Sequence, residues 1–376
     1  MSQFPLMLVL VANLGSTSFK FKLLDMSSKN GEVVARGGYE RIGQAGSQYK
    51  SHGDVIDEIL KTLSRPPDAI GFKAVHGGPI SGAVRVNDEV IATMEQFTDV
   101  APAHNPPYIA AMKALRQRLP NVPQVAAFET AFHQTIPRSR QVYAIPHEWT
   151  EKLGIRRYGF HGASHRYIAT RVKELLPSAT KVISCHLGGS CSICAIEDGK
   201  SVANSFGMTA QSGVPHNNRV GDFDAFALQK LLKSGLSLEE IFRRLSKEGG
   251  MLGLSGVSPD MRDVEKAAAE GNARAKLAID AFVESVRHFI GSYLVALGGC
   301  DVLAFTGGIG ENGVAIRKDI CRNLTWAGID LDLEKNNTRG SETKISSDRS
   351  RTQIWIVPTN EELIVARQTV EVLNQK

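Results

Sequence analysis

The chain repeats one local pattern, a strand–turn–strand hairpin whose turn is rich in glycine and serine. The first copy is Val11 to Ser18, and the second, about half a chain later, is Cys185 to Cys191. Glycine lets the backbone approach a ligand closely, and the amides and hydroxyls of such a turn converge as donors for a phosphate. A single copy is more often an ordinary turn. Two copies, one in each half, predict two related domains that close on a phosphorylated ligand.

The size and charge of the chain limit what it can bind. Its 376 residues suffice for about two domains, and the formal charge of +5 is spread out. We find no Lys/Arg run interleaved with aromatic residues, so nucleic acid is not an expected partner. Met1 to Val11 is apolar but short, and it predicts a first strand rather than a signal peptide. No apolar run is long enough to span a bilayer. These features favour a cytoplasmic protein without a membrane partner.

The cysteines do not indicate a metal centre. Five are present, an odd count, and Cys185, Cys191 and Cys194 fall on one predicted hairpin. No fourth ligand follows at a spacing typical of a zinc or iron–sulfur site. We expect reduced, partly buried thiols.

Several predicted strands end in polar clusters. The apolar run 69–75 leads into His76-Gly77-Gly78-Pro79, the run 122–128 ends at Glu129, and the run 302–306 leads into Gly307. Ligands of open α/β sheets bind at such carboxyl ends. Glycines before a helix that starts near residue 307 also predict an anion site. A change of domain is expected near 146–154. Helices are expected at 54–63, 108–118, 164–176, 223–232, 238–247 and 363–373, and two more between 263 and 297, separated at Gly271-Asn272.

Six motifs follow one another in a fixed order along nearly the whole chain. They are Asn13–Ser18, Val75–Gly78, His104–Pro107, Thr130–Thr135, Tyr158–Gly162 and Pro358–Glu362. This set resembles the acetate kinase family, which includes propionate kinases and belongs to the actin-like ATPase superfamily. The resemblance implies an α/β fold with two similar actin-like domains, each of the ribonuclease H-like type, and a cleft between them. Residues 1–150, completed by the helix 362–376, would bind the acid, and residues 151–361 the nucleotide.

The resemblance also implies an activity. A homodimeric enzyme would move the γ-phosphoryl group of ATP to a short carboxylic acid such as acetate or propionate, reversibly, with Mg²⁺ or Mn²⁺. Phosphoryl transfer needs positioned cations, and Arg219, in a loop of Gly, His and Asn, has the planar fork that matches phosphate oxygens. Family matching makes Arg219 and His161 the stabilisers of the transferred group. It makes Glu129 a third catalytic residue, which orients the acid or a metal-bound water, and it assigns Asn13 and Glu361 to the metal.

The remaining candidates divide between nucleotide and acid. Nucleotide contacts are expected from Lys20, His186, Leu187, Gly188, Gly189, Ser190, Asp260, Met261, Arg262, Gly308, Ile309, Gly310, Glu311 and Asn312. The acid would be held by Lys73, Val75, Ala103, Phe160 and Ala210.

Some of these positions depart from the family pattern and leave alternatives open. Lys73 replaces a usual arginine and Glu129 a usual aspartate, while Ala103 and Ala210 are smaller than the usual leucine and proline, which hints at a larger acid. Gly189 and Ser190 stand where Asn-Gly is usual, so the turn has lost a side-chain amide, and the loop before Arg219 reads Pro215-His216-Asn217-Asn218 where the family has Met-Gly-Thr. A larger acid, another donor such as pyrophosphate, or a non-catalytic nucleotide-binding relative are the alternatives.

Overall fold

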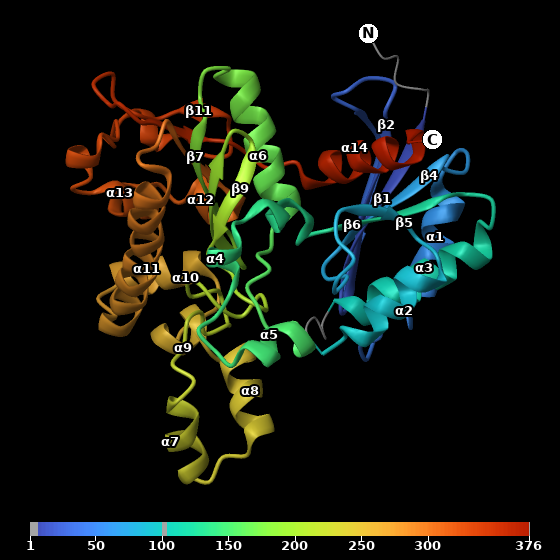
Figure 1. The fold of residues 1–376 in the computed structure, drawn as a ribbon, viewed down its shortest axis with the longest axis horizontal. Coiled ribbons are helices and arrows are strands. Elements are labelled where there is room, and N and C mark those ends of the chain that lie inside the picture. The colour runs from blue at the N-terminus through green and yellow to red at the C-terminus, as the bar shows by residue number, and fades with distance from the viewer. Residues whose placement is uncertain (1–6, 100–103, 376) are drawn as a thin grey trace. The chain divides into compact units, whose positions relative to one another are not determined.

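The computed structural model describes residues 7–99 and 104–375, and the chain divides into two compact units (Figure 1). Unit 1 is Met1–Gln134, Gly162–Tyr167 and Asn360–Lys376. Unit 2 is Thr135–His161 and Ile168–Thr359. The functional division predicted at residue 150 stays a prediction.

Unit 1 is built on a six-stranded mixed sheet with strand order β3-β2-β1-β4-β6-β5. Strands β1, β2 and β3 form an antiparallel meander, β4 and β6 continue the sheet parallel to β1, and β5 pairs antiparallel with β6. The strands are β1 (Leu8–Gly15), β2 (Ser18–Asp25), β3 (Glu32–Tyr39), β4 (Ala69–Ala74), β5 (Ala83–Arg85) and β6 (Gln124–Phe128).

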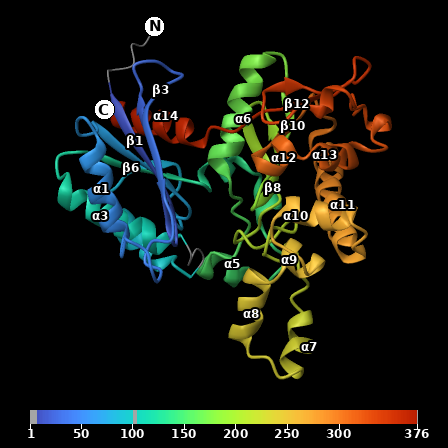
Figure 2. The ribbon, with the colours of Figure 1, turned by 180° about the vertical axis from the view of Figure 1, so that it is seen from behind.

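Helices cover both faces of this sheet because its strands are apolar on both sides. In β1, Leu8 and Leu10 join one buried cluster, while Val9 and Val11 join another that includes residues of α14. This alternation is the period of two that a strand imposes. Figures 1 and 2 show α14 on one face and α1 and α3 on the other. The helices are α1 (His52–Thr62), α2 (Asp88–Gln96), α3 (Asn105–Arg118) and α14 (Glu361–Asn374).

Unit 2 has a second six-stranded sheet, with order β11-β12-β10-β7-β8-β9. Strands β7, β8 and β9 form an antiparallel meander, β10 and β12 follow parallel to β7, and β11 pairs antiparallel with β12, which repeats the strand arrangement of unit 1. This repetition confirms the predicted pair of similar α/β domains. The strands are β7 (Lys181–Leu187), β8 (Cys191–Glu197), β9 (Lys200–Asn204), β10 (Val302–Thr306), β11 (Thr343–Lys344) and β12 (Gln353–Ile356).

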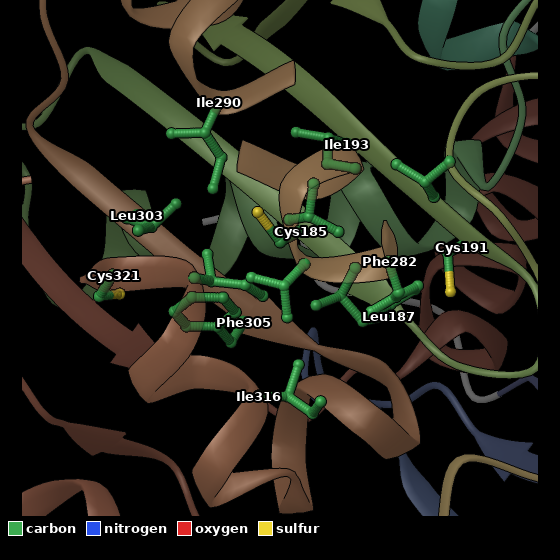
Figure 3. Close-up of a cluster of buried hydrophobic side chains, with 14 of the residues drawn as sticks. Cys185, Leu187, Cys191, Ile193, Phe282, Ile290, Leu303, Phe305, Ile316 and Cys321 are labelled. Atoms are coloured by element: carbon green, nitrogen blue, oxygen red, sulfur yellow. The ribbon is translucent and has the colours of Figure 1, made fainter. Parts of the chain in front are cut away.

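The core of unit 2 lies between its sheet and the long helix α11. Figure 3 shows Phe282 and Ile290 of α11 packed with Ile193, Leu303 and Phe305 of the strands. The helices of this unit are α4 (Arg138–Gln141), α5 (His147–Leu153), α6 (Gly162–Leu175, whose first turns belong to unit 1), α7 (Ala227–Lys233), α8 (Leu238–Lys247), α9 (Gly250–Ser255), α10 (Met261–Ala269), α11 (Ala273–Leu297), α12 (Gly307–Asn312) and α13 (Val314–Cys321). Short 3₁₀ turns lie at Ala131–Thr135, Thr325–Ala327 and Lys335–Asn337.

Three of the five cysteines, Cys185, Cys191 and Cys321, belong to this apolar core, and Cys300 packs against it. All five are free, and Figure 3 shows the sulfur atoms of Cys185, Cys191 and Cys321 apart from one another. Burial raises the pKa of the Cys191 thiol to about 12, so this thiol stays protonated.

Most predicted helices form, with shifts at their ends. Asn272 separates α10 from α11 as predicted, because its side chain accepts a hydrogen bond from the amide of Ala275 and caps α11. The helix predicted from residue 223 starts only at Ala227, since Asp224 Oδ1 accepts from the Phe226 amide in a local turn. No helix in the described ranges is long and apolar enough to cross a bilayer.

Candidate active site

Three charged residues meet at the carboxyl ends of the parallel strands of unit 1. Lys73 lies near the end of β4, Glu129 directly follows the neighbouring β6, and Glu361 is the first residue of α14. The Lys73 ammonium is 3.3 Å from Glu129 Oε1 and donates a hydrogen bond to Glu361 Oε2. One predicted acid-binding residue, Lys73, one predicted catalytic residue, Glu129, and one predicted metal ligand, Glu361, therefore share one cluster.

This cluster is buried, and the pKa values of Lys73 and Glu129 are therefore shifted. Burial acts to lower the pKa of Lys73, but the charges of Glu361 and Glu129 outweigh it and raise that pKa well above its usual value. Burial raises the pKa of Glu129; Glu361 adds to the effect and Lys73 opposes it. One ammonium thus faces two carboxyl groups, an arrangement that favours a further cation.

The start of α6 fixes Glu129 from the other side. The Glu129 carbonyl accepts from the Gly162 amide at 3.0 Å, and Glu129 Oε2 accepts from the Ala163 amide at 3.4 Å. A Cβ on residue 162 would lie 2.1 Å from the Glu129 carbonyl oxygen, so only glycine fits there. The Tyr158–Gly162 motif therefore has a steric reason to end in glycine.

The first hairpin adds Asn13 and Lys20, which lie opposite each other on β1 and β2. The buried Tyr108 hydroxyl of α3 accepts from the Leu14 amide at 2.9 Å and donates to Asn13 Oδ1 at 3.5 Å. Burial raises the Tyr108 pKa, so the phenol remains a donor. Sequence reasoning missed Tyr108; its only signal was an aromatic residue directly after the His104–Pro107 motif.

In unit 2, Phe206 is the centre of an aromatic and histidine cluster. Its ring contacts Phe160 at 5.6 Å and His161 at 5.2 Å between centroids, and His161 is 4.2 Å from His186. His161 Nδ1 is hydrogen-bonded to Ser192 Oγ at 2.9 Å. His161 has a left-handed backbone (φ +57°) immediately before α6. Such conformations are rare for residues other than glycine and concentrate at functional sites.

The loop of Arg219 packs beside this cluster. The Arg219 guanidinium donates to the Ala210 carbonyl, and burial lowers its pKa, although the group remains a cation at neutral pH. His216 is stacked on Phe206 at 5.3 Å. Burial and the nearby Arg219 lower the pKa of His216 to about 3. Two of the predicted reaction residues, His161 and Arg219, are therefore linked through Phe206 and His216.

The predicted nucleotide segments meet at the carboxyl ends of β7 and β10. A Cβ on Gly188 would lie 3.8 Å from the Gly308 amide, and one on Gly307 would lie 2.7 Å from the Leu187 carbonyl oxygen. The Gly188–Ser190 turn and the start of α12 are therefore side by side. The start of α12 is a poorer anion site than the sequence predicts. The helix has only six residues, and the Gly307 amide already donates to Glu311 Oε1 at 2.9 Å.

Two groups of predicted residues are not joined to these clusters. Asp260 caps α10, accepting from the Arg262 amide and pairing with the exposed Arg262 guanidinium, so its described contacts are local. Val75 is partly buried against the unit 1 core. Ala103 lies outside the described residues.

The sequence of this chain matches the acetokinase family over residues 53–367. The chain belongs to the acetokinase family. Among its relatives, the acetate kinase of Phocaeicola vulgatus is 43% identical over 400 residues, covering 98% of this chain and 100% of the relative. That of Natranaerobius thermophilus is 42% identical over 401 residues, again with 98% and 100% covered.

Solved structures of acetokinases have the same fold. The Porphyromonas gingivalis acetate kinase matches with a TM-score of 0.91 at 38% identity, covering 98% of this chain and 100% of that one. A Francisella tularensis propionate kinase matches with a TM-score of 0.87 at 38% identity, covering 97% and 100%. The predicted family and fold are confirmed.

Proposed function

We propose that this acetokinase transfers the γ-phosphoryl group of ATP to the carboxylate of a short acid, acetate or propionate, giving an acyl phosphate and ADP reversibly. The family match over residues 53–367, with full-length relatives that are acetate kinases, carries the proposal. The charged groups retained in each unit support it, since a non-catalytic relative would have no need of the buried Lys73, Glu129 and Arg219.

In this reaction the protein supplies charge and position. The transferred group carries negative charge on its equatorial oxygens, and a guanidinium can pair with two of them at once. Arg219 provides that cation, and its bond to the Ala210 carbonyl fixes the direction of its side chain. His161, held by Ser192 and packed between His186 and Phe206, donates a second hydrogen bond to the same oxygens.

The acid is bound through its carboxylate by Lys73. The Lys73 ammonium stays charged because Glu361 and Glu129 raise its pKa, and it bonds one carboxylate oxygen at a time where arginine would bond two. Glu129 orients this ammonium from 3.3 Å. The resemblance assigns Val75, Ala103, Phe160 and Ala210 to the acyl chain, and the alanines at 103 and 210, smaller than the usual leucine and proline, favour an acid as large as propionate.

The unit 1 cluster also fits a divalent cation of the kind that accompanies ATP. Glu129 Oε1 is buried and, apart from its ion pair with Lys73, has no hydrogen-bond partner among the described residues. Oxygen donors from Asn13 and Glu361 suit Mg²⁺, which keeps several waters and takes few protein ligands. When bound, the metal would neutralise phosphate charge, and Mn²⁺ could replace it.

A panel of acids and donors tests the proposal. We expect phosphorylation of acetate and propionate with ATP, measured as ADP release and as acyl hydroxamate formation, and little with pyrophosphate. Arg219→Ala should lower kcat by about 10³-fold or more, as for other arginines that contact a transferred phosphoryl group. Preference for a longer acid or for pyrophosphate would select an alternative. An Arg219→Ala variant of full activity would reject the assigned role.

Assembly and location are part of the same proposal. The resemblance favours a homodimer, which light scattering can test against the chain mass of 40.8 kDa. Five free cysteines favour a reducing compartment such as the cytoplasm. No nucleic acid or membrane partner is proposed.

A further inference from the structure

We propose that Asn217 donates its side-chain amide to the phosphates of the nucleotide at the Gly188–Ser190 turn, and so determines donor affinity. The inference rests on the proposed function, which assigns this turn to ATP. It assigns a role to a residue of the Arg219 loop, where the sequence departs from the family pattern without indicating what the new side chains do.

Asn217 lies directly beside the turn. Its backbone amide donates to the Gly189 carbonyl at 3.0 Å. A Cβ placed on Gly189 would be 3.6 Å from Asn217 Nδ2 and 3.8 Å from Asn217 Cγ. The amide of Asn217 therefore occupies the neighbourhood in which a side chain of residue 189 would begin.

The donor end of this amide is the end available to a ligand. Asn217 Oδ1 accepts from the Asn218 amide at 2.9 Å, which fixes the amide orientation. Among the described residues, Nδ2 makes no hydrogen bond, and the side chain is only partly buried. A neutral amide with two free N–H groups suits phosphate oxygens, and Gly188 and Gly189 offer no side-chain donor of their own.

The backbone of Asn217 is held in place before any ligand binds. The Leu252 amide donates to the Asn217 carbonyl at 2.9 Å. The adjacent His216 accepts from the Cys191 amide through Nδ1 at 3.0 Å and donates from Nε2 to the Ser212 carbonyl at 3.2 Å. Because Cys191 follows the turn, His216 fastens the loop of Asn217 to it. A donor held in this way loses little entropy on binding.

The test is ATP and ADP binding by calorimetry, with Mg²⁺, on full-length variants, together with KM for ATP and for the acid. We expect Asn217→Ala to raise Kd and KM for ATP about tenfold, the effect of one hydrogen bond to a charged group, and to leave KM for the acid unchanged. Asn217→Asp should weaken ATP binding further, because a carboxylate repels phosphate. Asn218→Ala, in the same loop, is the matched control and should bind ATP normally.

Moving the side-chain amide from residue 217 to residue 189 distinguishes a contact with the ligand from a structural role of Asn217. Gly189 has room for a side chain and a backbone that any residue adopts, so the double variant Gly189→Asn with Asn217→Ala should recover ATP affinity to within about threefold of the wild type. ATP binding by Asn217→Ala equal to that of the wild type, or no recovery in the double variant, would overturn the inference while leaving the proposed function intact. A wild-type protein that binds no ATP would overturn both.

Discussion

Glu129 illustrates how one residue's environment determines its chemistry. Its carboxyl group is buried beside Glu361 and opposed by the Lys73 ammonium, and the net effect raises its pKa above the ordinary 4.5. The folded protein therefore binds this proton more tightly than the unfolded chain does. The stability that this provides is complete below about pH 4.5 and is lost as pH rises through the raised pKa.

Glu129→Gln should remove that pH dependence. The amide is neutral throughout, and Lys73 stays charged over the same range because its own pKa is raised. We expect the free energy of unfolding of the variant, minus that of the wild type, to increase between about pH 4.5 and neutrality. Urea unfolding at four pH values measures this difference. Parallel profiles for the two proteins would show that Glu129 has an ordinary pKa.

The sequence located the charged residues of the site better than their neutral partners. Lys73 and Glu129 stand beside motifs at predicted strand ends, and Arg219 is the charged residue in a loop of Gly, His and Asn, so all three are visible in the sequence. Tyr108 lies beside the first hairpin only because α3 packs there, and packing of this kind leaves no local signal. The departures at Gly189 and at the loop 215–218 were visible in the sequence, whereas the contact that places the Asn217 amide beside Gly189 was not.

At the scale of elements, the start of α6 depends on one glycine. A side chain at residue 162 would overlap the Glu129 carbonyl, and relief would move either the helix or Glu129. We expect Gly162→Ala to lower the free energy of unfolding by about 1–3 kcal/mol, the usual cost of overpacking, and to reduce kcat. Thermal and urea unfolding measure the first effect, and acid phosphorylation the second.

Gly291, inside α11, is the matched control. Apart from the neighbouring backbone of α11 itself, no atom of the described residues lies within 4 Å of a Cβ built there, so alanine meets no obstacle. Gly291→Ala should stabilise the helix by about 0.5–1 kcal/mol, because alanine loses less entropy on folding. Equal stability of Gly162→Ala and the wild type would show that the contact at Glu129 relaxes freely.

Elements themselves were predictable where their pattern is local. The separation of α10 from α11 at Asn272 followed from a glycine and a capping residue, and the strand 302–306 from its apolar run. The late start of α7 was not predicted, because an Asx turn at Asp224 competes with the helix. At α12, the glycines predicted a helix start whose amides are available to an anion. The sequence did not show that Glu311 Oε1 accepts a hydrogen bond from the first of these amides, that of Gly307.

At the scale of the whole molecule, each unit has its own buried core. The clusters around α11 lie in unit 2, and those around α1, α3 and α14 lie in unit 1. All three tryptophans, Trp149, Trp326 and Trp355, belong to unit 2. Tryptophan fluorescence therefore reports the unfolding of unit 2 alone, while far-UV circular dichroism reports both units.

This distribution makes the thermodynamic independence of the units measurable. We expect the urea transitions followed by fluorescence and by circular dichroism not to coincide, since chains with two cores commonly depart from two-state unfolding. ADP with Mg²⁺ should move the fluorescence transition to higher urea, because the Gly188–Ser190 turn and α12 both lie in unit 2. At a ligand concentration of 100 times Kd the stabilisation is about 2.7 kcal/mol. Asn217→Ala, at the same ADP concentration, should show a smaller shift. Coincident transitions that move together with ADP would mean that the two units unfold as one cooperative block.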